Sequence, residues 1–279
     1  MYRLKTKIEL REIPIHLMLI SGSILMIAPF IWMILTSFKT AGDSISYPPK
    51  FIPEPFTLES YKDILDKLPI LKFYLNSLIY TIGRMIPSII FCSFAGFIFA
   101  KAEFRGKNTI FFFIISCMIF PIELRITSLY NLMDRLRWVD TYQAVILPNI
   151  MEPFGIFLFR QAIKDIPDDL IYSAQIDGCG IIKTYWYVIF RLITPTLIAY
   201  TILCFIWSWG DFLWPLIILI SESKYPIEVG IKGLSDYNFA PYNTMMAGAT
   251  LAITPIIIFF IIMQKYFIKG MTITGLKEG

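Results

Sequence analysis

Apolar residues gather into long runs along the chain, and polar residues fill the connections between them. Residues 14–38 contain His16 but no Asp, Glu, Lys or Arg, and residues 237–264 contain none of these five residue types. About 20 apolar residues, at ~1.5 Å of rise each, cross the hydrocarbon core of a bilayer. Six runs approach this length, at residues 14–38, 73–100, 108–126, 141–160, 192–220 and 242–264. The pattern predicts an all-α integral membrane protein of about six transmembrane helices, in a single membrane domain that covers residues 1–279.

Composition supports a membrane protein and argues against several other classes. Hydrophobic residues make up 56% of the chain and charged residues 16%, whereas soluble domains carry roughly 25% charged residues. Lys and Arg lie in the gaps between apolar runs and form no basic face, so a nucleic-acid partner is not expected. The single histidine and four isolated cysteines form neither a metal site nor a disulfide framework. We therefore expect no metal and no cofactor.

The N-terminal residues are basic and precede the first apolar run, as in a signal peptide; they include Arg3, Lys5, Lys7 and Arg11. A signal peptide has an apolar region of about 7–15 residues that is closed by a small-residue cleavage site. The run at residues 14–38 is longer, and no clear cleavage site closes it. An uncleaved first span is the better interpretation.

The distribution of basic residues in the connections predicts the orientation in the membrane. If the N-terminus is cytoplasmic, the inner connections hold 14 Lys and Arg in 67 residues and the outer ones hold 10 in 67. An excess of Lys and Arg marks the cytoplasmic side, so we expect both termini there. The outer segment 39–72 is rich in proline, which predicts a mostly irregular external cap.

The connection at about 164–191 carries signals for a short helix. Pro167 suits the first helical position, where its missing N–H costs nothing. Asp168 and Asp169 in the first turn complement the positive end of the helix dipole. Gly178 can adopt the left-handed conformation that ends helices.

Two interpretations of this short helix compete. Ile166, Leu170 and Ala174 recur every four residues, which gives an apolar stripe on an otherwise polar helix. Such a helix could lie on the membrane surface, or a soluble partner could bind it. The acidic first turn would be repelled by anionic lipids, which favours a protein partner.

The same segment resembles the cytoplasmic loop of ABC importer permeases, whose pattern is roughly Pro-x-Glu-Leu-x-Glu-Ala-Ala-x-Ile-Asp-Gly-Ala. The matching or conservatively substituted residues are Pro167, Asp169, Leu170, Ala174, Ile176, Asp177 and Gly178. Tyr172 and Ser173 stand where the family usually has Glu and Ala.

Other segments are similar to the maltose-type carbohydrate branch of that family, in the same order along the chain. They are Ser37-Phe38-Lys39-Thr40, Asn76-Ser77-Leu78, Ile146-Leu147-Pro148, Arg160-Gln161, Trp209-Gly210-Asp211-Phe212-Leu213-Trp214-Pro215-Leu216 and Gly270-Met271-Thr272-Ile273-Thr274-Gly275-Leu276-Lys277. The chain departs from the pattern at Gly210, a frequent Asn, and at Arg191-Leu192, where Leu-Pro is common.

The resemblance implies a permease subunit of a carbohydrate ABC importer in the cell inner membrane. Its partners would be cytoplasmic ATP-binding cassette subunits, a second homologous permease and an extracytoplasmic sugar-binding protein. The chain has no Gly-x4-Gly-Lys-Ser/Thr phosphate loop, so a separate subunit would hydrolyse ATP and this chain would be non-catalytic. The residues that the resemblance assigns to ATPase coupling are Pro167, Asp169, Leu170, Ala174, Asp177 and Gly178.

Arg84, Glu152 and Asp211 are charged residues inside the predicted spans, and ionisable groups there are functional candidates. We hypothesise an Arg84–Glu152 pair that lines a translocation path. Asp211 could instead stabilise a break in the fifth span. Trp209 is a candidate for the path because sugar faces stack on aromatic rings, although interfacial anchoring and helix packing explain it better.

Two other functions compete with the importer. An ion-coupled secondary transporter would need carboxylates that coordinate ions near mid-membrane, and usually inverted repeats. A membrane-embedded enzyme would need a catalytic set that the sequence lacks. Neither requires the loop at 165–180, which is the feature that discriminates between them and the importer.

Overall fold

The structure is a computed structural model that describes residues 13–236 and 241–275, with side chains described for 13–234 and 241–266. Its described residues form helices and connections and contain no strand, which confirms the all-α prediction. Two groups of residues named from the sequence lie outside the described side chains: the basic N-terminal residues at 3–11 and the tail segment at 270–277.

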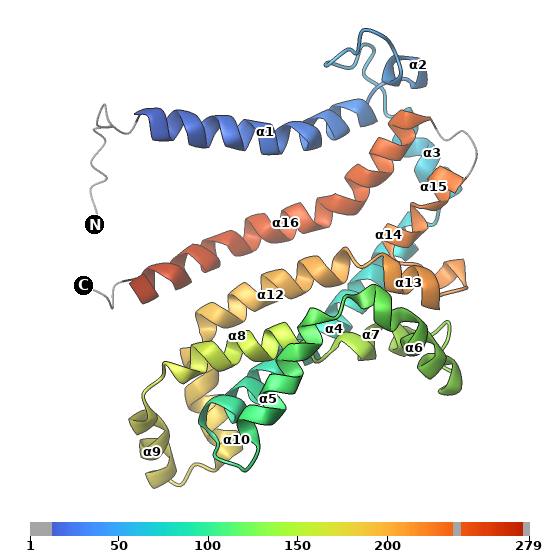
Figure 1. Cartoon of the computed structure of the whole chain (residues 1–279). Coiled ribbons are helices and arrows are strands. Elements are labelled where there is room, and N and C mark those ends of the chain that lie inside the picture. Colours follow the sequence, from blue (N-terminus) through green and yellow to red (C-terminus); the bar gives the residue numbers. More distant parts are fainter. Residues whose placement is uncertain (1–12, 237–240, 276–279) are drawn as a thin grey trace. The chain divides into compact units, whose positions relative to one another are not determined.

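Five helical segments within the described residues are long and apolar enough to span a membrane (Figure 1). They are Ile13–Ser37, Ile70–Lys101, Tyr142–Lys164, Thr194–Ile218 and Tyr242–Tyr266. Each overlaps one of the predicted runs. A sixth candidate is the pair Lys107–Ile119 and Ile122–Arg135, bent by 105°. The described residues therefore hold five candidate spans, or six if the bent pair counts as one span.

The third run was expected as one continuous span at 108–126, and this detail is wrong. Helix α5 (Lys107–Ser116) continues into a 3-10 turn, Cys117–Ile119, and α6 (Ile122–Arg135) then starts in a new direction. Pro121 lies at the break with ψ 149°, and Phe120 before it is also extended. Proline disfavours helical geometry in the residue before it, so the helix ends at this point.

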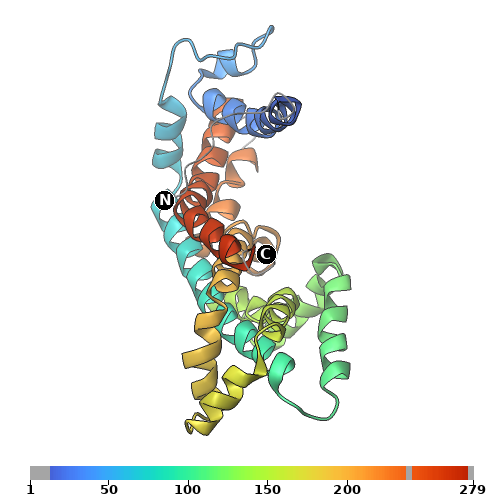
Figure 2. The ribbon, with the colours of Figure 1, turned by 90° about the vertical axis from the view of Figure 1, so that its left-hand side faces the viewer.

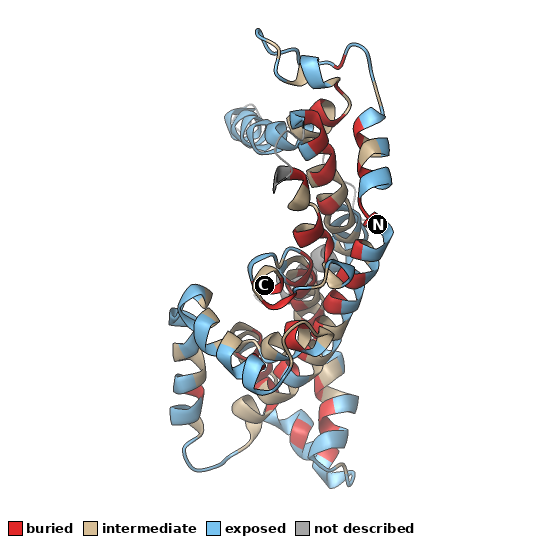
Figure 3. Ribbon diagram, turned by 90° about the vertical axis from the view of Figure 1, so that its right-hand side faces the viewer, coloured by how far each residue is buried: buried red, intermediate tan, exposed pale blue. Residues whose placement is uncertain are grey.

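The structure divides into two compact units. Within the described residues, the first comprises 13–68, 233–236 and 241–252 and contains α1 (Ile13–Ser37), α2 (Ala41–Ser44), α3 (Glu59–Lys67), α15 (Gly233–Asp236) and the start of α16 (Tyr242–Gly275). Only Thr36 and Ser37 of α1 are buried, and the rest of its surface is mostly exposed and apolar (Figure 3). This exposed surface fits a lipid or protein environment rather than water.

Lys39 and Asn243 order the proline-rich cap within this first unit. The Lys39 side chain is only 1% exposed, donates to the carbonyl oxygen of Lys50 at 2.5 Å, and lies 4.1 Å from the ring centre of Trp32. Burial lowers the pKa of Lys39, and Asp43 opposes this shift. Asn243 donates to the carbonyl of Lys39 and to the hydroxyl of Ser60, both at 2.8 Å. Outside α2 and α3 the cap is irregular, as predicted.

The second unit comprises, of the described residues, 69–232 and 253–275 and is built around α4 (Ile70–Lys101). This helix packs against α8 (Pro153–Lys164) and α12 (Thr194–Trp209), as Figure 2 shows. Gly96 permits the contact with α8, because a Cβ there would lie 2.7 Å from Phe159 Cβ. Phe159 is fully buried between α4 and α12, where it meets the ring of Tyr200 edge-on at 5.1 Å.

Shorter elements complete this unit. They are α7 (Tyr142–Ile146), the 3-10 turn Leu147–Asn149, α9 (Asp168–Ile176), α10 (Ile181–Thr184), a π-helical turn at Tyr185–Ile189, α11 (Phe190–Leu192), α13 (Leu213–Ile218), the 3-10 turn Glu222–Lys224 and α14 (Ile227–Gly230).

Asp140 fastens the connection after α13. Its carboxylate accepts hydrogen bonds from the backbone N–H groups of Ile220 and Ser221 at 3.0 Å and lies 2.8 Å from the Lys224 ammonium. Burial by itself would raise the pKa of Asp140. The hydrogen bonds from Lys224 and Ser221 lower this pKa by a larger amount, so it lies well below its usual range. The ionised carboxylate thus holds this loop in place.

Candidate functional site

A buried polar stripe on α4 positions the interior charge. Asn76, Tyr80, Arg84, Ser88 and Cys92 follow one another at intervals of four residues, and each is at most 9% exposed. Residues at this spacing lie on one face of a helix. The sequence singles out Arg84 as an interior charge, and the four-residue spacing of polar side chains could have revealed the whole stripe.

Hydrogen bonds to other segments of the chain hold the stripe near both of its ends. Asn76 donates to the carbonyl oxygens of Ser223 and Tyr225 at 3.0 Å and accepts from Tyr142 at 2.9 Å. Ser88 shares a 2.8 Å hydrogen bond with the hydroxyl of Tyr200 on α12. Arg84 therefore lies on a helix face that is held at both ends.

Arg84 bridges two carboxylates. Its Nη2 atom lies 2.7 Å from Glu152 Oε1, which confirms the predicted pairing. Its Nη1 atom lies 3.4 Å from Asp211 Oδ2, a contact that the sequence analysis did not predict. The three residues form the ion cluster, which joins α4 to segments about 70 and 130 residues away in the chain.

Both carboxylates of the ion cluster lie where a helix begins. Glu152 is the N-cap of α8, directly before Pro153. Asp211 lies in the break between α12, which ends at Trp209, and α13, which begins at Leu213. It accepts a hydrogen bond from the backbone N–H of Trp214, in agreement with the expectation that it stabilises a broken helix. Negative charge is favourable at a helix N-terminus.

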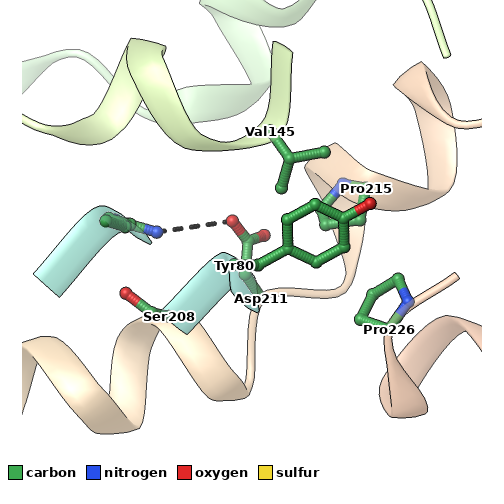
Figure 4. A pocket seen from close by; sticks show the side chains of 7 residues that line it. Tyr80, Val145, Ser208, Asp211, Pro215 and Pro226 are labelled. Atoms are coloured by element: carbon green, nitrogen blue, oxygen red, sulfur yellow. Dashed lines mark hydrogen bonds and ion pairs between the residues drawn. The ribbon is translucent and has the colours of Figure 1, made fainter. Parts of the chain in front are cut away.

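A narrow cleft adjoins the ion cluster. It is lined by Tyr80, Arg84, Val145, Ser208, Asp211, Pro215 and Pro226 (Figure 4). Two buried polar atoms of this lining, Arg84 Nε and Ser208 Oγ, have no hydrogen-bond partner in the described part of the chain. Trp209 is 4% exposed, stacks on Phe205 at 5.6 Å, and is absent from the lining of the cleft.

The second candidate feature is α9, the short helix predicted from the loop. It begins at Asp168, so Pro167 is its N-cap rather than its first helical residue. Gly178 has φ +80°, the left-handed conformation expected of it. The N–H of Cys179 donates to the carbonyl of Ala174 at 2.9 Å and that of Gly178 to Gln175 at 3.0 Å, a Schellman ending.

The predicted apolar stripe of α9 is partly wrong. Ala174 is buried and Ile166 packs against the core, but Leu170 is 44% exposed. Ile171, only 7% exposed, faces inward in its place, because residues 171 and 174 lie three positions apart on one face. Asp169, Leu170, Asp177 and Gly178 are exposed on the outside.

Lys101, the last residue of α4, holds the start of this helix. Its ammonium donates to the carbonyl of Ile166 at 2.5 Å, to the carboxylate of Asp168 at 2.7 Å and to the carbonyl of Lys164 at 3.3 Å. The Lys101 side chain is only 10% exposed. No local sequence signal marks Lys101, since it lies more than 60 residues before its acceptors.

Comparison with known proteins gives consistent similarities over almost the whole chain. Residues 14–273 match the family described as "Binding-protein-dependent transport system inner membrane component". The chain is 33% identical, over 89% of its length and 90% of the relative, to the arabinooligosaccharides transport system permease protein AraQ of Halalkalibacterium halodurans. It is 27% identical, over 93% of its length and 95% of the relative, to the sn-glycerol-3-phosphate transport system permease protein UgpE of Agrobacterium fabrum.

Among solved structures, the chain is similar to a chain from a bacterial ABC transporter involved in the import of the acidic polysaccharide alginate. The TM-score is 0.81 at 23% identity, over 94% of this chain and 100% of the other. This similarity supports the fold.

Proposed function

The chain belongs to the family of binding-protein-dependent transport system inner membrane components, and on this basis we propose that it forms half of the pathway by which an ABC importer moves a sugar or oligosaccharide. Family membership makes it a multi-pass permease of the plasma membrane. The substrate class comes from similarity to the arabinooligosaccharide permease. This membership favours the importer over the ion-coupled transporter weighed above.

The observation that carries the coupling part of the proposal is the exposed acidic face of α9 on a tethered helix. Asp169, Leu170 and Asp177 are exposed, while Ala174 and Ile171 hold the opposite face against the core. A cytoplasmic ATP-binding cassette subunit would bind this exposed face. Pro167 and Gly178 determine where the helix begins and ends. Ala174 packs against the core of this chain and does not contact the partner.

Lys101 connects α9 to α4, so that a movement of α9 can reach the membrane interior. A displacement of α9 by its partner would pull on Lys101 and so on α4, the helix that also carries Arg84. Packed helices transmit such movements as small rigid-body shifts between discrete states. Arg84, Glu152 and Asp211 are the proposed path residues, and Trp209 is a more peripheral candidate because it does not line the cleft.

The remaining partners follow from the same assignment. An importer needs two permease halves, so we propose a second, homologous permease, and an extracytoplasmic binding protein that delivers the sugar. With α9 on the cytoplasmic side, both termini also lie in the cytoplasm, in agreement with the distribution of Lys and Arg.

The test is co-purification of the tagged chain from its native membrane, with an ATPase assay on the proteins that co-elute. We expect an ATPase and a second permease to co-elute with the wild type. Gly178→Arg should lose the ATPase or its stimulation by substrate, because φ +80° strains any side chain and the new cation alters an exposed surface. Gly42→Arg is the matched control, since Gly42 is exposed on α2 with open space around it.

Purification of the chain alone, with no ATPase and no effect of Gly178→Arg, would reject the proposal. A self-contained transporter would then be the better explanation.

A further inference from the structure

A helical segment with an exposed aromatic and basic face follows α9 in the chain. Residues 181–192 comprise α10, the π-helical turn and α11, and they end just before the span that begins at Thr194. Figure 1 shows α9 and α10 at the same end of the second unit. Under the proposed function this end is cytoplasmic, so the segment lies where the chain enters the membrane from the cytoplasm.

One face of this segment is buried in the core of the unit. Tyr185, Ile189 and Ile193 follow one another at intervals of four residues, and each is at most 2% exposed. The hydroxyl of Tyr185 also shares a 2.7 Å hydrogen bond with Ser93 on α4. These contacts fix the rotation of the segment, so its remaining side chains point away from the core.

The other face is both apolar and basic, and we call it the lipid face. Its apolar side chains, each 42–62% exposed, are Ile181, Ile182, Trp186, Tyr187 and Leu192. Lys183 and Arg191 are exposed beside them, and neither forms an ion pair with the described part of the chain. The ring of Trp186 is held in place by a contact with Phe190, at 4.9 Å between ring centres.

This combination of side chains matches the cytoplasmic surface of a bilayer. Trp and Tyr gather at the membrane–water interface, where the apolar ring and the polar edge both find a partner. Anionic lipids of the cytoplasmic leaflet attract Lys and Arg, and each such residue near the surface strengthens binding about 5-fold. The exposed Asp169 and Asp177 of α9 would be repelled by the same leaflet. Charge therefore separates α9, which suits a protein partner, from the segment that follows it.

We propose that the lipid face binds anionic phospholipids of the cytoplasmic leaflet. Lys183 and Arg191 donate hydrogen bonds to the lipid phosphate groups, and Trp186 and Tyr187 lie at the level of the glycerol backbone. The bound lipid holds the start of α12 at the membrane surface while α9 moves with its partner. The inference rests on the proposed function, because that function places this end of the unit in the cytoplasm.

The experiment identifies what lies against the lipid face by photo-crosslinking. The aromatic crosslinker p-benzoylphenylalanine replaces Tyr187 in the complex purified with its co-eluting subunits. The complex is placed in nanodiscs that contain equal amounts of phosphatidylglycerol and phosphatidylcholine with identical acyl chains. After irradiation, mass spectrometry identifies the adducts. We expect lipid adducts in which phosphatidylglycerol exceeds phosphatidylcholine about 10-fold or more.

Variants and a second crosslinking position provide the controls. Lys183→Gln with Arg191→Gln should lower the lipid ratio to about 1. Arg125→Gln with Arg135→Gln, which removes two exposed cations of α6, should leave the ratio unchanged. The same crosslinker in place of Tyr172, which is 58% exposed on α9, should react with the ATPase subunit instead of lipid.

Protein adducts at position 187, equal labelling of the two lipids, the absence of any adduct, or a ratio that Lys183→Gln with Arg191→Gln does not change would each overturn the inference. If position 172 still reacts with the ATPase in these cases, the proposed function stands and only the lipid face fails. Lipid adducts at both positions would instead support the lipid face and reject the binding of α9 to an ATPase. Should the double variant fail to assemble, the ratio without it and Lys183→Gln alone, expected to lower that ratio about 5-fold, still decide.

Discussion

The ammonium of Lys101 lies 2.7 Å from the carboxylate of Asp168 and thereby joins the last residue of α4 to the first turn of α9. Asp168 is well exposed, so the ion pair by itself contributes little, about 0.2–1 kcal/mol. The carbonyl oxygens of Ile166 and Lys164 accept hydrogen bonds from the same ammonium. These three contacts of Lys101 together form what we call the anchor of α9. This anchor is the direct connection between the exposed helix and the helix that carries Arg84.

Removing the anchor should uncouple the helix without unfolding the chain. In Lys101→Met the apolar stem remains and the three hydrogen bonds are lost. We expect substrate-stimulated ATPase activity of the co-purified complex to fall about 5- to 10-fold, equivalent to about 1–1.4 kcal/mol. Lys62→Met, at an exposed position of α3, is the control. Full activity of the Lys101 variant would show that movement does not pass through this anchor.

The stability of the C-terminal end of α9 should depend on the backbone conformation of residue 178 rather than on the space around its side chain. No other heavy atom lies near a Cβ built on Gly178, so the cost of Gly178→Ala comes from its φ of +80°, about 1–2 kcal/mol. Gly178→Asn should cost less, because Asn tolerates this region better. Hydrogen exchange of the Gly178 and Cys179 amides should accelerate about 10-fold in the Ala variant and less in the Asn variant. Equal exchange in both variants would contradict this account.

Breaking the ion cluster from the cationic side should be costly. Arg84→Met leaves the partly buried carboxylates of Glu152 and Asp211 without their cation, at a cost of about 1–3 kcal/mol. Adding Glu152→Gln removes one of the unpaired charges, so the double variant should regain part of the lost stability. The measurement is thermal denaturation of the detergent-solubilised proteins. A double variant no more stable than Arg84→Met would mean that the two residues are not energetically coupled.

Close packing of α4 on α8 should be sensitive to a single methyl group. In Gly96→Ala the new Cβ would lie 2.7 Å from Phe159 Cβ and 2.8 Å from the backbone nitrogen of Arg160, so one helix must shift. Overpacking of this kind costs about 1–3 kcal/mol, and we expect a lower Tm. Gly22→Ala on α1, where nothing lies within 4 Å, should not lower it. A Tm unchanged in Gly96→Ala would indicate a looser contact.

The contribution of Asp140 should disappear in acid. Hydrogen bonds from Lys224 and Ser221 outweigh burial and hold the folded-state pKa of Asp140 below its unfolded value of about 3.9. A lowered folded-state pKa gives stability that is fully present above the unfolded pKa and is lost as the pH falls through the folded one. Asp140→Asn should therefore destabilise the chain at pH 7 by about 1–2 kcal/mol, and the difference from wild type should shrink below about pH 4.

Tm values of wild type and Asp140→Asn between pH 7 and pH 3 provide the measurement. Asp66→Asn, at an exposed position of α3, is the control and should match the wild type throughout. A constant difference between Asp140→Asn and wild type at every pH would assign the effect to packing instead of charge.

The sequence by itself determined the elements whose causes are local. Runs of apolar residues specify membrane helices because each residue's transfer from water to lipid depends on its own side chain. The helix at 168–176 follows from Pro167, the acidic first turn and Gly178, which all act within a few residues of the helix ends. Pro121 divides the third apolar run into α5 and α6. The mean hydropathy of the run gives no sign of this break.

Only the tertiary structure decided which distant groups meet. The pairing of Arg84 with Glu152 could be hypothesised because a charge deep in a span needs an opposite charge, but the second partner, Asp211, depends on how α12 breaks and packs beside α4. The contact of Lys101 with α9 likewise depends on how α4 and α9 pack. Leu170 faces outward because the packing of Ile171 and Ala174 against the core fixes the rotation of α9. Local sequence sets where a helix begins and ends, whereas its rotation and neighbours follow from packing summed over the whole unit.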